Sequence, residues 1–266
     1  MNQIPSDTIR QYVRDRYRQI ADPSASQDSC CDSGCGCGTT PVDYQQISAK
    51  MGYSDTELSV VPDGANLGLG CGNPQAIAEL KAGETVLDLG SGGGFDCFLA
   101  SKQVGATGKV IGVDMTPEMV TKARYNAVQG GYRNVEFRLG EIENLPVADN
   151  SVDCIISNCV INLSPEKPQV FREAFRVLKQ GGRLAVSDIV TTRNLPDHIK
   201  KDMNSLSGCI SGASSMFQIE SMLKDAGFGD ILITAKDESR QFIKDWIPDA
   251  NIENFIVSAV IKAVKV

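Results

Sequence analysis

The amino-acid sequence predicts an α/β fold, a doubly wound and mostly parallel sheet with helices on both faces. Three observations predict it. Short runs rich in Val, Ile and Leu alternate with amphipathic stretches of helical length, glycine or proline stands at most of the junctions, and one junction is strongly glycine-rich. Strands separated by helices of about 10–15 residues imply right-handed crossovers, which make neighbouring strands parallel.

The alternating part of the chain runs from residue 84 to residue 190. The strands expected there, in chain order, are 85–90, 109–115, 134–140, 151–158 and 183–190. The helices expected between them are 94–104, 117–131 and 167–182. Two later apolar runs, 231–239 and 255–266, are expected to close the sheet.

The flanking segments are less regular. Residues 6–20 carry apolar side chains at helical spacing with Ser6 as the expected N-cap, whereas 41–70 have turn signals and are expected to be irregular. We therefore divide the chain into three parts. These are an N-terminal helix and cysteine-rich loop at 1–70, a ligand-binding α/β domain at 71–190, and a cysteine-bearing insertion after strand five with the C-terminal strands at 191–266.

Composition and charge limit the partners. With 42% hydrophobic and 22% charged residues, the 266-residue chain is that of a globular protein with a sizeable core. The net charge of −7 argues against nucleic acid and against an anionic membrane surface as partners. The apolar run Phe255 to Val260 is too short to span a bilayer, and the polar start MNQIPSDTIR has no signal-peptide core, so we expect a cytoplasmic location.

The glycine-rich junction is the first candidate binding site. It reads Asp88-Leu-Gly90-Ser91-Gly92-Gly-Gly94 and joins the first expected strand to the first helix of the alternating part. Glycines there allow a tight turn and let a ligand approach the backbone where a side chain would collide. A nicotinamide-binding domain has a glycine-rich turn in the same place, so this loop alone does not decide the ligand.

Polar residues at the ends of the next strands extend this site. Asp114 and Met115 end the second strand, where a carboxylate can accept the hydrogens of both ribose hydroxyls. Glu141 and Ile142 follow the third strand, where an acidic residue can bind the adenine amino group and an apolar one can cover the ring. Asn158 ends the fourth strand at the same edge of the sheet.

These features, in this order and spacing, resemble the class I S-adenosylmethionine methyltransferases, a Rossmann-like family. The resemblance covers residues 84–190 and implies S-adenosyl-L-methionine as cofactor, with Asp88 facing its amino group. The other implied cofactor-binding residues are Gly90, Ser91, Gly92, Gly94, Asp114, Met115, Glu141, Ile142 and Asn158. The aspartate that opens the loop and the segment LGEIENLP count against the nicotinamide alternative.

The nine cysteines are the unusual feature of the composition. An odd number in a chain of this size is not typical of a secreted disulfide framework, and in a reducing cytoplasm such thiols stay free unless they bind a soft ion or do redox chemistry. Cys97 and Cys154 lie within apolar runs and are expected to fill the core. Four others form a cluster near the N-terminus: Cys30, Cys31, Cys35 and Cys37.

Three single cysteines stand at chemically favourable places. Cys159 follows the fourth strand at the sheet edge where open α/β folds bind ligands. Cys71 precedes a proline-started helix whose free amides favour thiolate, and its flanking glycines are expected to keep the sulfur accessible. Cys209 lies in the segment after the fifth strand, where methyltransferases commonly place acceptor-binding elements.

The segments around these thiols, GLGCGNP, ISNCVINLSPEK and SGCISGA, resemble the arsenite methyltransferases of microbial type. The N-terminal cluster and the helix IRQYVRDRYRQIA belong to the resemblance, which covers most of the chain. It implies that Cys71, Cys159 and Cys209 hold trivalent arsenic and that an N-terminal cysteine, Cys30 or Cys31, joins a redox relay. A zinc site, a second arsenic-capturing site or a tail without consequence remain alternatives for the cluster, and zinc is disfavoured because paired CxxC spacing is absent.

The function expected from this resemblance is arsenic detoxification by methyl transfer from S-adenosylmethionine to arsenite or methylarsenite. The arsenic lone pair needs no general base, so the single histidine, His198, is expected to be a surface residue. A thiol reductant, thioredoxin or glutathione, is expected as electron source. Two alternatives remain: a methyltransferase of a quinone, sterol or similar small molecule, and a non-catalytic metalloid-binding protein.

Overall fold

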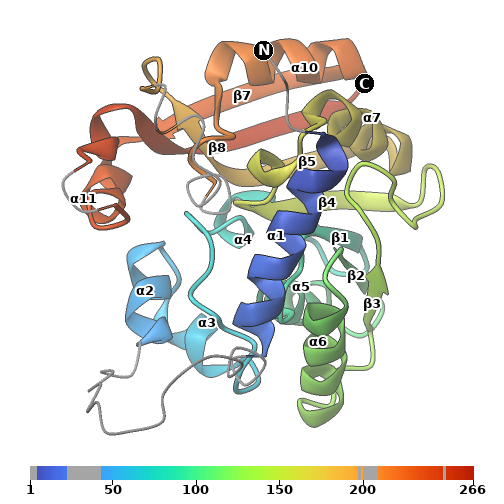
Figure 1. Cartoon of the computed structure of the whole chain (residues 1–266). Coiled ribbons are helices and arrows are strands. Elements are labelled where there is room, and N and C mark those ends of the chain that lie inside the picture. The colour runs from blue at the N-terminus through green and yellow to red at the C-terminus, as the bar shows by residue number, and fades with distance from the viewer. Residues whose placement is uncertain (1–4, 23–42, 197–198, 200–208, 248–249) are drawn as a thin grey trace, which may run out of the picture.

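One mixed sheet organises the molecule (Figure 1). The computed structural model describes residues 5–22, 43–196, 199, 209–247 and 250–266, so Cys30, Cys31, Cys35, Cys37 and His198 lie outside the described residues. The strand order is β3-β2-β1-β4-β5-β8-β7, with β6 beside β5. The strands are β1 Thr85–Leu89, β2 Lys109–Asp114, β3 Val135–Leu139, β4 Val152–Asn158, β5 Leu178–Thr191, β6 Ser214–Ser215, β7 Phe228–Lys236 and β8 Ile256–Lys265.

The sheet is mostly parallel, as the sequence predicts. Strands β1 to β5 form parallel pairs, and β8 pairs antiparallel with both β5 and β7. The order reverses at β1, because β2 and β3 lie on one side of it and β4 and β5 on the other. In open α/β sheets a ligand crevice forms outside the carboxyl ends of the strands at such a reversal.

Helices cover both faces of the sheet. They are α1 Ser6–Ala21, α2 Tyr44–Lys50, α3 Asp55–Ser59, α4 Gln75–Ala78, α5 Phe95–Val104, α6 Pro117–Gln129, α7 Lys167–Val177, α10 Met216–Ala226 and α11 Arg240–Ile243. Helices α7 and α10 lie on one face, and α4, α5 and α6 lie on the other. No helix among the described residues is long and apolar enough to cross a membrane.

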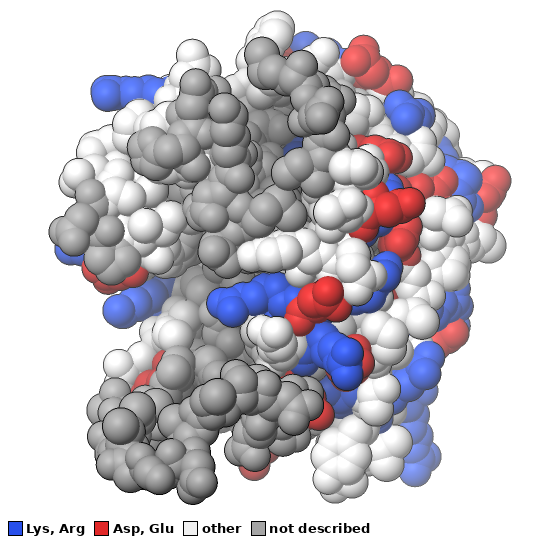
Figure 2. All heavy atoms as spheres, in the orientation of Figure 1, with Lys and Arg blue, Asp and Glu red and all other residues white. Residues whose placement is uncertain are grey.

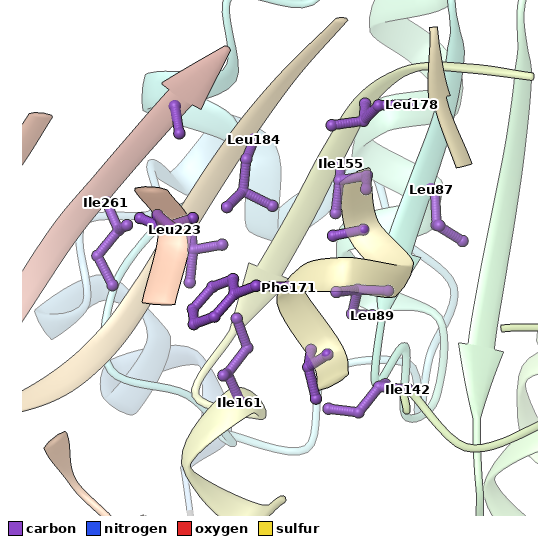
Figure 3. Close-up of a cluster of buried hydrophobic side chains, with 14 of the residues drawn as sticks. Leu87, Leu89, Ile142, Ile155, Ile161, Phe171, Leu178, Leu184, Leu223 and Ile261 are labelled. Carbon is purple, nitrogen blue, oxygen red and sulfur yellow. The ribbon is translucent and has the colours of Figure 1, made fainter. Parts of the chain in front are cut away.

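The two faces of the sheet bury separate apolar clusters, since successive strand side chains point to opposite faces. Leu87, Ile155 and Leu184 pack with Phe171 of α7 on one side, as Figure 3 shows. Cys154 lies on the other side in the cluster that also contains Cys97, and both thiols are fully buried. Truncation of a core aromatic such as Phe171 to alanine costs about 3–5 kcal/mol in comparable cores.

Three local expectations are wrong. The N-cap of α1 is Pro5 rather than Ser6, which is the first helical residue. Residues 41–70 contain the short helices α2 and α3, whose starts are capped by the side chains of Asp43 and Ser54. The third expected helix ends at Val177 rather than near Gly182, because Leu178 already has an extended backbone, with a ψ of 141°, and begins β5.

Helix α1 lies across the carboxyl edge of the sheet (Figure 1). Its Val13 is fully buried, Arg14 donates to the carbonyl of Met115, and the carbonyl of Ala21 accepts from Lys122 of α6. Acidic and basic side chains are interspersed on the described part of the face in Figure 2. The strands of the described residues join one sheet. We therefore propose the division of the chain at residues 70 and 190 as a division of functional roles and not of separate folding units.

Candidate active site

A cavity of about 800 Å³ opens at the carboxyl ends of β1, β2 and β4. Its floor is formed by the loops after these strands, and α1 and residues 242–247 form walls. Most of the residues predicted to bind the cofactor lie in its lining, namely Asp88, Gly90, Ser91, Gly92, Asp114, Met115, Ile142 and Asn158. Gly94 and Glu141 are not part of the lining.

The glycine-rich loop is shaped for close approach. Gly90 has a φ of 68°, and a Cβ there would collide with Val160. Ser91 is buried beside the cavity, and its Oγ has no hydrogen-bond partner among the residues that the structure describes. A buried polar atom without a partner is costly unless a ligand satisfies it, so this atom fits a polar ligand in the cavity. Gly94 instead has a φ of 94° and starts α5.

Two carboxylates flank this loop, the buried Asp88 and the half-buried Asp114. Asp114 accepts from the N–H of Gly92 at 2.9 Å and from the N–H of Thr116 at 2.8 Å. Asp88 accepts from the thiol of Cys97 at 3.2 Å. Burial raises the pKa of both carboxyl groups, and the neighbouring Asp96 raises that of Asp88 further. A cationic amino group and ribose hydroxyls are the ligand groups that such carboxylates accept best.

Glu141 has a different environment from the one expected. Its carboxylate binds Arg14 at 3.2 Å and Arg10 at 3.6 Å, both on α1. Glu143, two residues later, lines the cavity and accepts from Ser164 at 2.6 Å. In this arrangement Glu141 ties α1 to the loop after β3, while Ile142 and Glu143 face the cavity.

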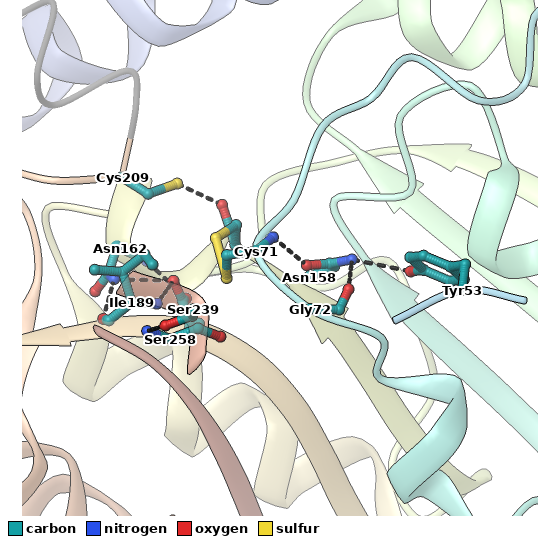
Figure 4. The surroundings of a disulfide bond; sticks show 11 residues. Tyr53, Cys71, Gly72, Asn158, Asn162, Ile189, Cys209, Ser239 and Ser258 are labelled. Carbon is teal, nitrogen blue, oxygen red and sulfur yellow. Dashed lines mark hydrogen bonds between the residues drawn. A yellow bond between two sulfur atoms is a disulfide. The ribbon is translucent and has the colours of Figure 1, made fainter. Parts of the chain in front are cut away.

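The three single cysteines of the prediction lie together, as Figure 4 shows. Cys71 and Cys159 form a disulfide across 88 residues of sequence, with Cα atoms 5.9 Å apart. The thiol of Cys209 donates to the carbonyl of Cys159 at 2.6 Å. Cys159 and Cys209 line the cavity, and Cys71 lies directly behind Cys159. Three cysteines from three distant segments are therefore neighbours at the end of β4, although the Sγ of Cys209 is not part of the group of ligand atoms within 4.8 Å of one another that contains the Sγ atoms of Cys71 and Cys159.

The backbone at two of these cysteines is unusual. Cys159 has a φ of 55° and Cys209 a φ of 62°, the left-handed region that non-glycine residues seldom adopt. The N–H of Cys159 donates to the carbonyl of Ser187 in β5 at 2.8 Å, which holds the turn after β4 in place. Non-glycine residues in such conformations persist where the surrounding structure dictates them, and they concentrate at functional sites.

Cys71 is less accessible than its flanking glycines suggested. Its side chain is 1% exposed, and both glycines serve close packing instead. A Cβ on Gly70 would lie 2.7 Å from Nδ2 of Asn158, and one on Gly72 would lie 2.9 Å from Oγ of Ser187. The helix after it, α4, has only four residues, so it supplies little of the expected dipole.

A carboxylate that the sequence analysis missed lies beside the thiols. An oxygen of Asp188 and the Sγ atoms of Cys71 and Cys159 all lie within 4.8 Å of one another. Asn162 donates its side-chain N–H to Asp188 at 2.9 Å. Burial raises the pKa of Asp188 to about 6. Burial, and then the charge of Asp188, hold the pKa of the Cys209 thiol well above its usual value, which favours a protonated thiol.

Aromatic side chains close the cavity above the thiols. Tyr17 from α1 and Phe242 and Trp246 from the segment around α11 line it, and the two latter rings contact each other with centroids 5.9 Å apart. The sequence analysis did not place any of these three side chains at the cavity. For Tyr17, the helical periodicity of α1 predicts a buried face but does not say what that face covers. The lone tryptophan of the chain was the available signal.

Comparison with known proteins agrees with this geometry. A family model described as a methyltransferase domain matches residues 80–227. An arsenite methyltransferase of Halobacterium salinarum is 52% identical over 98% of this chain and 67% of its own length. The chain belongs to the arsenite methyltransferase family. This family depends on S-adenosylmethionine.

Other members of the family extend the comparison. An arsenite methyltransferase of Aquipseudomonas alcaligenes is 45% identical over 60% of this chain and 48% of its own length. The crystal structure of an arsenic(III) S-adenosylmethionine methyltransferase from Chlamydomonas reinhardtii superposes with a TM-score of 0.62 and 31% identity, over 85% of this chain and 74% of that one. The chain thus spans two thirds of the archaeal relative and about half of the bacterial one.

Proposed function

We propose that this chain transfers a methyl group from S-adenosylmethionine to trivalent arsenic held by Cys71, Cys159 and Cys209. One observation carries the proposal. Three cysteines that are far apart in sequence are neighbours at the wall of the cavity that we assign to the cofactor, and Cys159 and Cys209 line it. Thiolate sulfur is the ligand that soft centres such as trivalent arsenic prefer. The membership of the chain in its family points to the same substrate.

Arsenic loading requires all three sulfurs as thiols. The disulfide between Cys71 and Cys159 is first reduced by two electrons and two protons from an external thiol pair, which itself becomes a disulfide. Each thiol then displaces one hydroxyl of neutral arsenous acid, so three arsenic–sulfur bonds form and three waters leave. The raised pKa of Cys209 suits this exchange, because the proton on the thiol becomes part of the departing water.

The protein positions and shields the reacting atoms. When bound, S-adenosylmethionine supplies an electrophilic methyl carbon on a sulfonium centre. Asp88, Ser91 and Asp114 have the groups to hold its polar ends in the cavity. Tyr17 and Trp246 pack against the apolar cluster that contains the three cysteines, which places them to keep water from the thiols. The arsenic lone pair needs no proton removed before it attacks. The absence of a histidine from the described lining is therefore compatible with catalysis.

The electron source belongs to the proposal as well. Methyl transfer makes arsenic formally pentavalent, and two electrons restore the trivalent state by forming a disulfide. The pair Cys71–Cys159 is one such disulfide. We propose Cys30 or Cys31 as the N-terminal partner of the relay, and thioredoxin or glutathione as the reductant that resets it, with arsenite and methylarsenite as the substrates.

The test uses the chain as it is. Purified protein is incubated with methyl-labelled S-adenosylmethionine, arsenite and a thiol reductant, and the arsenic species are separated. Labelled methylarsenic that forms only when all three are present is expected. Cofactor binding by calorimetry without any labelled arsenical would overturn the proposal in favour of a non-catalytic metalloid-binding protein. Label that instead enters a quinone or sterol acceptor, with none in arsenic, would also overturn it.

A further inference from the structure

We propose that the side chain of Asn158 is a positioning residue that delivers Cys71 to the arsenic site and thereby sets the preference for inorganic arsenite over methylarsenite. The proposal rests on the proposed function for its substrates. The placement of Cys71, in contrast, is argued from hydrogen bonds within the protein and does not depend on the proposed function. The sequence assigned Asn158 to the cofactor, and those contacts give it a different role.

Asn158 binds the backbone on both sides of the Cys71 side chain. Its Oδ1 accepts from the N–H of Cys71 at 3.0 Å, and its Nδ2 donates to the carbonyl of Gly72 at 2.8 Å (Figure 4). The amide orientation follows from these partners, since an N–H needs an acceptor and a carbonyl needs a donor. Because Asn158 directly precedes Cys159, this clamp joins the loop of one cysteine to the strand end of the other.

The hydroxyl of Tyr53 supports the clamp from behind. It accepts the second N–H of the Asn158 amide at 3.0 Å and donates to the carboxylate of Asp96 at 2.8 Å. Tyr53 is 4% exposed and is absent from the cavity lining, so the network lies within the protein. Both N–H groups of the amide are thus used by protein partners, which leaves no donor for the cofactor.

The loop and the amide fit each other closely. Gly70 has a φ of 130°, and its hydrogen faces the amide where a Cβ would lie 2.7–2.8 Å from three atoms of Asn158. The loop therefore approaches Asn158 as nearly as backbone can. No other side-chain hydrogen bond to the backbone N–H of Cys71 is present among the described residues. Loss of the amide leaves that N–H and the carbonyl of Gly72 without their partner.

The number of thiols that each substrate binds makes the placement of Cys71 important for one substrate and not for the other. Arsenous acid has three exchangeable hydroxyls and takes three thiols, whereas methylarsenite has two and takes two. Cys159 and Cys209 face the cavity and remain in place without the clamp, because Cys159 is held by Ser187 in β5. Displacement of Cys71 therefore lowers kcat/KM for arsenite, which needs three thiols, and leaves that for methylarsenite, which needs two.

The experiment compares Asn158→Ala and Tyr53→Phe with the unchanged protein. For each, kcat/KM is measured with arsenite and with methylarsenite at saturating S-adenosylmethionine, and the ratio is the readout. We expect the ratio to fall by about tenfold in Asn158→Ala and by about threefold in Tyr53→Phe, since a buried group that loses its partner costs that much in binding. Tyr53→Phe keeps the packing and serves if the alanine variant fails to fold.

Two controls separate positioning from general damage. Asn126→Ala removes another buried amide, one that donates to the carbonyl of Gly93 in the cofactor loop, and it is expected to change the KM for S-adenosylmethionine without changing the ratio. Cys71→Ser is expected to lower the ratio by itself, and Asn158→Ala added to it is expected to lower the ratio no further.

A second readout needs no arsenic. The Cys71–Cys159 disulfide is equilibrated with glutathione and quantified by mass spectrometry of the linked peptides. Loss of the clamp separates the thiols, so Asn158→Ala is expected to shift the equilibrium about tenfold toward the reduced pair. An unchanged ratio together with an unchanged equilibrium in Asn158→Ala overturns the inference, as does an equal ratio change in Asn126→Ala. If the unchanged protein methylates no arsenical, the proposed function fails, and the disulfide equilibrium alone supports or overturns the positioning.

Discussion

The thiol of Cys97 in α5 donates a 3.2 Å hydrogen bond to Oδ2 of Asp88, at the end of β1. Both groups are buried, and Asp88 faces the cofactor cavity. Cys97 was expected only to fill the core. It does lie in the core, but its thiol also fixes the direction of a carboxylate that we assign to the cofactor.

The first prediction concerns this pair. Cys97→Ala should raise the KM for S-adenosylmethionine by about three- to tenfold, because Asp88 loses the donor that orients it. Cys97→Ser should restore most of the affinity, since a hydroxyl donates in place of the thiol. Steady-state kinetics and calorimetry measure both effects.

Cys154→Ala is the matched control for this prediction. Its thiol is equally buried in the same cluster, and its hydrogen-bond acceptors among the described residues are backbone carbonyls at 3.8 and 4.0 Å. It should cost comparable stability and leave cofactor affinity alone. Equal losses of affinity in the two alanine variants would contradict a specific role for Cys97.

The second prediction separates the three arsenic-site cysteines. Cys159→Ser and Cys209→Ser should abolish methylation of arsenite and methylarsenite, because both sulfurs face the cavity. Cys71→Ser should lower kcat/KM for arsenite and spare that for methylarsenite. Cofactor binding should be nearly unchanged in all three variants. Full arsenite activity in any one of them would refute its assignment as an arsenic ligand.

The third prediction concerns the contact between α1 and the loop after β3. Arg14 binds Glu141 at 3.2 Å and the carbonyl of Met115 at 3.3 Å, and its side chain is 32% exposed. Arg14→Gln should raise the KM for S-adenosylmethionine by about two- to fivefold, since partly exposed pairs contribute modestly. The effect should shrink as salt is added, because salt screens the pair in the unchanged protein.

Arg18→Gln gives the comparison for α1. Arg18 pairs with Glu118 at 3.2 Å, is 58% exposed and lies outside the cavity lining. Its replacement should leave the KM for the cofactor as it is. A similar rise in both variants would mean that the charge of α1, rather than its attachment beside the cavity, determines the effect.

The fourth prediction uses the pH dependence of stability. Burial raises the pKa of Asp96 to about 6 from an ordinary value of 3.8, so the folded state holds a proton that the unfolded state has released between these values. Folding is therefore favoured by this group at acid pH, and that contribution is lost as the pH rises through about 6. Asp96→Asn has no carboxyl group to ionise, so it should raise the free energy of unfolding at pH 7.5 by at most about 3 kcal/mol.

Urea unfolding at two pH values tests this prediction. The difference in free energy of unfolding between Asp96→Asn and the unchanged protein should be largest at pH 7.5 and much smaller at pH 4.5. Asparagine keeps an oxygen that accepts from Tyr53, so the hydrogen bond itself is preserved. A difference that is the same at both pH values would show that titration of Asp96 is not its cause.

Much of the cofactor half was predictable from the sequence, because its signals are local. The alternation of apolar strands with helices is read within windows of a few residues, and the structure confirms the mostly parallel sheet it predicts. Asp88, Gly90 and Asp114 follow from their place at strand ends, since parallel strands bring those ends to one edge. The local misses, α2 and α3, are short helices whose starts depend on single capping side chains.

The roles of Glu141 and Asn158 show where local signals fail. Both stand at strand ends, as the sequence indicates, but their partners come from elements far away in the chain. Glu141 binds arginines 127 and 131 residues earlier, and Asn158 binds the backbone of Cys71, 87 residues earlier. No spacing rule connects such residues, because the path of the intervening loops decides whether they meet.

By itself, the sequence determined a doubly wound sheet, a glycine-rich cofactor loop and a cysteine at the end of β4. The family resemblance implied that Cys71 and Cys209 join that cysteine, and the tertiary structure supplied the contacts that bring them to it. The tertiary structure alone decided that α1 covers the cavity and that an asparagine amide holds the loop of Cys71. The physical reason is the range of the interactions. Periodicity and turn chemistry act between neighbours along the chain, whereas the meeting of three thiols depends on close packing between segments that only the folded chain brings together.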